Sequence, residues 1–180
     1  MRSGLPQLVA GHLWRIKATG SAGGNLLKNL FNQGIVKNVL SAVNVAEGKY
    51  IKLISPGDFL YDKNTLKEFI VFAEENPAAF YFGNTFYYYI DNNGIIYTYS
   101  DIKNPRDLRT WNSHNMRRIY KKYLVDCDYI CGAAIMYNTQ KFSKYLNEIS
   151  TFVTFAEDCS MIYMIANKEN AYYVNMQGCV

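Results

Sequence analysis

Stretches with helical and with strand-like apolar spacing alternate along the chain from residue 25 onward. Apolar residues recur at helical spacing over residues 25–48, with a break expected at the Asn-Gln-Gly of residues 32–34, and again over residues 64–76. Between these two stretches, residues 49–55 read KYIKLIS, which predicts a short buried strand that Pro56 and Gly57 end. Because helices that alternate with strands carry the chain across the face of a sheet, the pattern predicts an α/β fold with flanking helices.

The second half of the chain continues this alternation and adds a hairpin. The aromatic stretches 78–90 and 94–100 flank the turn sequence DNNG, which predicts an antiparallel hairpin insertion. An antiparallel insertion in a strand–helix alternation makes the expected sheet mixed. A further apolar strand is expected over residues 128–138, and helices over residues 117–124, 139–149 and 157–170.

The composition fits one domain and indicates the cellular compartment of the protein. With 49% apolar residues, a chain of 180 residues can bury a real core. No run of 18 apolar residues occurs, so we expect no membrane span, and the first residues do not resemble a signal peptide. The four cysteines lack the spacing of a zinc site, which predicts reduced thiols in a cytoplasmic protein.

The positive charge is concentrated at the N-terminus. Residues 1–24 hold three basic residues, no acidic residue and five of the twelve glycines, whereas residues 25–180 hold 16 basic and 15 acidic residues. A nearly neutral body argues against a groove that tracks nucleic-acid phosphates, so we expect no nucleic-acid partner. The change of composition at residue 25 predicts either a non-native leader or a flexible native N-terminus over residues 1–24, with the domain proper over residues 25–180.

Asp58 is the first candidate site residue. It follows the strand 49–55, and ligands of open α/β sheets bind outside the carboxyl ends of the strands. A carboxylate at this place suits a divalent cation, because hard cations prefer oxygen ligands. The alternative is that Asp58 is a turn residue that follows Pro-Gly.

Glu157 and Asp158 form the second candidate. Two acids at the start of an apolar helix ordinarily complement the helix dipole. An acid held at this place near a sheet could instead act as a general base. The sequence leaves both interpretations open.

Four sequence blocks together resemble a family 2 glycosyltransferase of the GT-A, Rossmann-like fold. Asn32 and Gly34 match the family's Asn-x-Gly, and Ala46, Gly48, Tyr50 and Ile51 match its Ala-x-Gly-x-Tyr-Ile. The segment YFGNTFYYYIDNNGII is similar to the family's strand and hairpin beyond the acidic turn, and FAEDCSMIYMIA to its Glu-Asp helix start. The likeness covers roughly residues 25–175 and implies a domain that lacks the family's first strand and its last segment.

The resemblance implies transfer of a sugar, with inversion, from a nucleotide-diphosphate donor such as a UDP-sugar to a hydroxyl of a saccharide or lipid-linked saccharide. It implies Asp158 as the general base and Glu157 as a residue that orients the site, with the two roles exchangeable. It implies Mg²⁺ or Mn²⁺ at Asp58. The implied donor-binding residues are Asn32, Gly34, Ser55, Gly57 and Asp58. The usual setting of the family is bacterial cell-envelope or capsular polysaccharide synthesis, in the cytoplasm or at the periphery of the inner membrane.

One departure from the family pattern supports a rival hypothesis. Where the family usually has an acidic cluster, this chain reads Ser55-Pro56-Gly57-Asp58, so one acid remains. The rival is a non-catalytic carbohydrate-binding or interaction module derived from a degenerate or truncated transferase. The tyrosine-rich stretch Phe86 to Tyr89 could present aromatic faces to a sugar, or could simply pack in its sheet.

Overall fold

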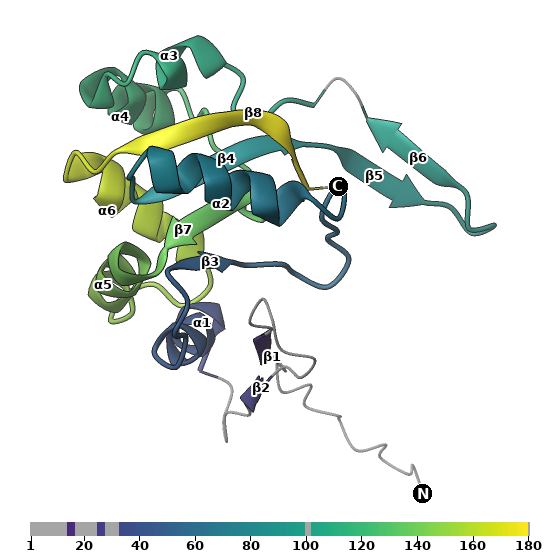
Figure 1. Cartoon of the computed structure of the whole chain (residues 1–180), viewed down its shortest axis with the longest axis horizontal. Helices are drawn as coiled ribbons and strands as arrows, with labels where there is room; N and C mark the ends of the chain where they lie inside the picture. The colour runs from purple at the N-terminus through teal and green to yellow at the C-terminus, as the bar shows by residue number, and fades with distance from the viewer. Residues whose placement is uncertain (1–13, 17–24, 28–32, 100–101, 180) are drawn as a thin grey trace, which may run out of the picture.

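Four strands form the central sheet of the protein (Figure 1). The computed structural model describes residues 14–16, 25–27, 33–99 and 102–179, and its side chains within 33–99 and 102–175. The predicted donor-binding residue Asn32 therefore lies outside the described residues. Across the sheet the order is β3 (Tyr50–Lys52), β7 (Ile135–Asn138), β4 (Phe80–Thr85) and β8 (Ala171–Cys179).

The central sheet is mixed, as the sequence predicts. Strand β7 runs antiparallel to both of its neighbours, with Tyr137 opposite Ile51 of β3 and opposite Phe80 of β4. Strand β8 pairs parallel with β4. Strands β3, β4 and β8 therefore run in one direction, and their carboxyl ends reach the same edge of the sheet. We call this edge the carboxyl edge.

Helices cover both faces of the sheet, which confirms the α/β class. Strand residues alternate between the faces, so that Phe80 and Phe82 lie in the larger core and Tyr81 lies in the smaller one. The larger core packs against five helices, and the smaller against one. The five are α1 (Ile35–Val43), α3 (Leu108–Asn112), α4 (Met116–Val125), α5 (Thr139–Ile149) and α6 (Ser160–Ala166); the one is α2 (Thr65–Glu75).

Aromatic rings fill much of the larger core. The ring of Trp111 lies 5.0 Å from that of Phe82 and 6.3 Å from that of Phe80, both edge-on. Tyr137 stacks on Phe142 of α5 at 4.1 Å. Because each such ring buries a large apolar area, these contacts fix how α3 and α5 sit on the sheet.

The predicted hairpin is present and projects from the carboxyl edge (Figure 1). Strands β5 (Tyr87–Ile90) and β6 (Ile96–Tyr99) pair antiparallel, with Tyr87 opposite Tyr99 and Tyr89 opposite Tyr97. The carboxylate of Asp91 accepts the N–H groups of Asn93 and Ile95 at 2.9 and 2.8 Å, which closes the loop between the strands. The pairing puts four tyrosines on one face of the hairpin.

Several element boundaries differ from the sequence prediction. Helix α1 begins at Ile35, and residues 33 and 34 before it are not helical, which confirms the expected break at 32–34 for the residues that the structure describes. Asn25–Leu27, however, forms a strand (β2) and not a helix. The strand expected over 49–55 is shorter and half-buried, and the one expected over 128–138 is reduced to β7 because a 3₁₀ turn, η1 (Gly132–Ala134), precedes it.

Strand β2 pairs antiparallel with β1 (Trp14–Ile16) in a sheet of its own, separate from the central one. This ladder joins a part of the predicted leader to the first residues of the predicted domain. Among the residues that the structure describes, no helix is long and apolar enough to cross a bilayer.

Candidate functional site

The turn that contains Asp58 lies at the carboxyl edge, directly after β3. The N–H of Asp58 donates to the carbonyl oxygen of Ser55 at 3.0 Å, and the N–H of Ser55 donates to Oδ2 of Asp58 at 3.1 Å. Asp58 therefore closes its own turn, as expected if it is a turn residue that follows Pro-Gly. The turn also presents the carboxylate at the edge where a ligand of such a sheet would bind.

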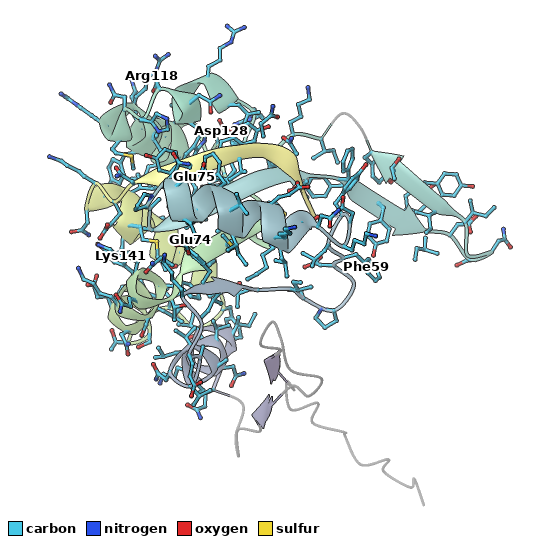
Figure 2. The ribbon with its side chains drawn as sticks, in the orientation of Figure 1. Phe59, Glu74, Glu75, Arg118, Asp128 and Lys141 are labelled. Atoms are coloured by element: carbon cyan, nitrogen blue, oxygen red, sulfur yellow. The ribbon has the colours of Figure 1, made fainter. Side chains whose placement is uncertain are left out.

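The hairpin holds this turn in place. The hydroxyl of Tyr88 donates to the carbonyl oxygen of Gly57, and the ring of Phe59 lies 6.0 Å from that of Tyr88. Tyr61 stacks on Phe86 at 5.6 Å. Figure 2 shows Phe59 beside the base of the hairpin. The turn therefore has defined partners although its residues are largely exposed.

The turn of residues 55–58 offers one carboxylate, that of Asp58, to a divalent cation. Oδ2 of Asp58 already accepts a hydrogen bond, and the carbonyl oxygen of Gly57 accepts the one from Tyr88. Within the described ranges no three His, Cys, Asp or Glu side chains come together as a metal site. A cation held here would take most of its oxygen ligands from water and from a bound diphosphate, which is a common arrangement for Mg²⁺.

A cavity of about 210 Å³ opens at the base of the hairpin, beside the carboxyl end of β4. Asn104 donates to the hydroxyl of Tyr87 at 2.7 Å, which ties one wall of the cavity to the hairpin. The buried hydroxyl of Thr85 has no hydrogen-bond partner in the part of the chain that the structure describes. Polar and apolar groups both line the cavity: Gly83, Asn84, Thr85, Phe86, Tyr99, Ile102, Lys103, Asn104, Pro105 and Leu108.

Glu157 and Asp158 lie in a 3₁₀ turn, η2 (Glu157–Cys159), that leads directly into α6. Burial raises the pKa of the Glu157 carboxyl above its usual value, and the neighbouring charge of Asp158 adds to the rise, against a lowering by a backbone hydrogen bond. The Glu157 carboxyl group therefore holds its proton to a higher pH than an ordinary glutamate does. A carboxyl group with a pKa shifted in this way suits proton transfer.

Two tyrosines of the larger core lie within electrostatic range of these acids. Burial raises the pKa of the Tyr137 phenol well above its ordinary value, and the charges of Asp158 and Glu157 raise it further. Burial likewise raises the pKa of Tyr123, with the charge of Asp158 next in importance. Both phenols thus stay neutral near the acids and can act as hydrogen-bond donors.

Gly34 lies against Thr154, in the segment that leads into η2. It precedes α1 with φ of +83°, and a Cβ atom on it would lie 2.7 Å from the carbonyl oxygen of Thr154. That carbonyl accepts the N–H of Val36 at 3.1 Å. The start of α1 is therefore docked on the segment that leads into η2, and only glycine fits at this contact.

The candidate residues thus fall into two groups. Ser55, Gly57 and Asp58 share the turn at the carboxyl edge, whereas Gly34, Glu157 and Asp158 gather around η2. In the described residues no hydrogen bond or ion pair joins Asp58 to either acid of η2. That the two groups share one ligand remains a prediction.

Sequence reasoning missed the groups that surround these residues. Tyr123 and Tyr137 belonged to a predicted helix and strand, but no pattern indicated that both lie within electrostatic range of the acids of η2. The cavity residues Thr85 and Asn104 lie 19 positions apart and meet only through the hairpin. The one available signal was the density of tyrosine around the DNNG turn.

A scan of the chain against protein-family models gives no match. A search of the curated proteins gives none either. The resemblance to a glycosyltransferase family therefore remains a prediction from the four sequence blocks.

Proposed function

We propose that this chain is a glycosyltransferase of the family 2 type with a GT-A fold. It transfers a sugar, with inversion, from a nucleotide-diphosphate donor to a hydroxyl of a saccharide or lipid-linked saccharide. The setting we propose is bacterial cell-envelope or capsular polysaccharide synthesis on the cytoplasmic side. The carboxyl pair Glu157–Asp158 carries this proposal, because both acids have a defined position in the turn that leads into α6 and burial raises the pKa of Glu157.

The positions of the four blocks support the proposal. The first two blocks lie between Gly34, which precedes α1, and Ile51 of β3, and the strand-and-hairpin block supplies β4 and β5. The Glu-Asp block is η2 with α6, which packs in the same core as Ile51 of β3. Blocks that are far apart in the sequence thus meet around one sheet, as the parts of a shared site must.

In the proposed reaction the carboxylate of Asp158 accepts the proton of the acceptor hydroxyl. The acceptor oxygen forms a bond to the anomeric carbon while the bond from that carbon to the diphosphate breaks, and the diphosphate leaves with the electron pair. Glu157 orients the acceptor, or exchanges roles with Asp158. Tyr137 and Tyr123 supply buried, neutral phenols within electrostatic range of the acids.

Donor binding in this proposal falls to Ser55, Gly57 and Asp58, to Gly34 before α1, and to Asn32. A divalent cation, Mg²⁺ or Mn²⁺, would be held by Asp58 together with oxygens of the donor diphosphate. When bound, it neutralises the charge of the leaving group. The cavity at the base of the hairpin offers asparagine and lysine side chains for sugar hydroxyls.

Binding of UDP, with and without Mn²⁺, tests the donor site. We expect UDP to raise the Tm only when Mn²⁺ is present, since a ligand that binds the folded state stabilises it. The Asp58→Asn variant should lose this shift, whereas Glu47→Gln, which removes an exposed carboxylate elsewhere, should keep it. A chain that no nucleotide stabilises under either condition contradicts the proposed donor site.

One observation favours the second candidate, a saccharide-binding module without catalysis. The hairpin presents the stacked rings of Tyr89 and Tyr97, 4.8 Å apart and exposed, beside the cavity. Such rings can stack on sugar faces without any base or metal. Saccharide binding that persists in Asp158→Asn, in a chain that shows no nucleotide binding, would favour this candidate over the transferase.

A further inference from the structure

The positive charge of the folded domain is concentrated in one segment. Residues 102–129, which include α3 and α4, hold seven basic and three acidic side chains. The remainder of residues 25–180 holds nine basic and twelve acidic side chains. A nearly neutral domain therefore has a basic side and an acidic remainder.

Helix α4 carries much of this charge on its outer face. Ile119 and Tyr123 are buried against the larger core, which turns Arg117, Arg118 and Lys121 toward solvent. Figure 2 shows Arg118 at the outer rim of the molecule, on α4. No acidic residue lies within α4 itself. We call the exposed side chains of α4 the α4 face.

The three outer cations of the α4 face form no direct ion pair in the part of the chain that the structure describes. Lys122, which is half-buried, contacts Asp126 at 2.9 Å and Asp107 at 3.7 Å, so these two acids neutralise one lysine at the margin of the face. Arg117, Arg118 and Lys121 form no ion pair with any carboxylate in the described ranges. Arg118 and Lys121 help to lower the pKa values of Asp107 and Asp126 through space, but all three exposed cations remain available for direct contact with an anionic partner.

Apolar side chains stand among these cations. Leu124 and Val125, the last two residues of α4, are 38% and 68% exposed, and Tyr120 is 37% exposed. Tyr129, just beyond the helix, is 48% exposed. A face that binds only phosphates in water gains nothing from exposed Leu and Val, whereas a bilayer accepts them below its headgroups.

We propose that the α4 face binds an anionic lipid surface, with Arg117, Arg118 and Lys121 at the phosphates and Tyr120, Leu124 and Val125 in the interface. The positive charge supplies the attraction, and the apolar side chains make the contact selective for a bilayer over a soluble polyanion. This binding holds the domain at the membrane by its α4 side and leaves the hairpin free. The proposal does not depend on the transferase activity.

The experiment is flotation of the full chain with large vesicles of phosphatidylcholine that contain 30% phosphatidylglycerol. We expect binding that fails with pure phosphatidylcholine and weakens in 0.5 M NaCl, because salt screens the attraction. Each cation near an anionic surface is worth about a fivefold change in partitioning, so Arg117→Gln/Arg118→Gln/Lys121→Gln should bind about 100-fold more weakly. Val125→Ser should weaken binding without changing its dependence on salt.

The matched control is Lys37→Gln/Lys63→Gln/Lys67→Gln, which removes three exposed cations from α1, α2 and the turn before α2. It has the same net charge as the triple α4 variant and should bind almost as well as the unmodified chain. Equal loss in both triple variants, or no binding to the anionic vesicles, overturns the proposal. The proposal is also overturned if the three cations are needed for binding duplex DNA or RNA while Val125→Ser binds the vesicles as well as the unmodified chain does.

Discussion

Asp128 accepts the backbone N–H of Arg106 at 2.6 Å, across the 22 positions that separate the two residues. The same carboxylate accepts the N–H of Asp107 at 3.0 Å through its other oxygen. Asp128 is 3% exposed, whereas the Arg106 side chain that reaches it at 3.4 Å is 65% exposed. The contact therefore acts mainly through two backbone groups, and it ties the segment before α3 to the segment after α4.

Asp128→Ala should cost about 3 kcal/mol of the free energy of unfolding, because it leaves two backbone N–H groups without their acceptor. Asp128→Asn keeps one acceptor oxygen and should cost less. Asp126→Ala, which removes an exposed carboxylate paired with Lys122, should cost about 0.5 kcal/mol and is the control. Urea denaturation measures all three, and equal losses in Asp128→Ala and Asp126→Ala would show that the buried hydrogen bonds do not matter.

Gly34→Ala and Gly57→Ala separate backbone strain from steric conflict. Both glycines have positive φ, +83° and +100°, so alanine is strained at either position, at a cost of about 1 kcal/mol. Only at Gly34 would the new Cβ meet a neighbour, the backbone of Thr154, whereas at Gly57 nothing lies within 4 Å. We expect Gly34→Ala to lose about 2 kcal/mol more than Gly57→Ala in urea denaturation. Equal losses would mean that α1 is not docked on this segment.

Glu157 predicts a dependence of stability on pH. Its pKa is raised in the folded protein, so the folded state binds more protons than the unfolded state between the two pKa values, and stability falls as the pH rises through that range. Glu157→Gln removes this loss. The Tm of the variant should exceed that of the unmodified chain at pH 7, and the difference should shrink as the pH falls to 4. Glu148→Gln, at an exposed position on α5, should show no such trend.

The elements that local sequence determines were predicted well. Helix α5 runs over the predicted residues 139–149 because its apolar residues lie on one face and the side chain of Asn138 caps the N–H of Lys141 at 3.1 Å. The DNNG loop forms as expected because Asp91 bonds the backbone of its own turn. In both elements the partners are only a few residues apart.

Elements that depend on distant partners were predicted less well. Asn25–Leu27 has helical apolar spacing and yet pairs as a strand with Trp14–Ile16, because a ladder partner overrides the local pattern. The surroundings of the two acids in η2 come from tertiary packing alone, which no local pattern specifies.

The last prediction separates chemistry from binding, and it rests on the proposed transferase. Asp158→Asn keeps the size and most hydrogen bonds of the side chain but removes the proton acceptor. Release of UDP from a panel of UDP-sugars, in the presence of Mn²⁺ and a saccharide acceptor, should therefore fall about 100- to 10,000-fold, the usual worth of a positioned general base. The affinity for UDP should hardly change, because Asp158 acts on the acceptor.

Asp58→Asn should show the reverse order, with UDP affinity lost first and the rate as a consequence. Glu148→Gln is the control for both. Full activity in Asp158→Asn together with loss of activity in Glu157→Gln would transfer the role of base to Glu157, and full activity in both variants would remove the proposed mechanism.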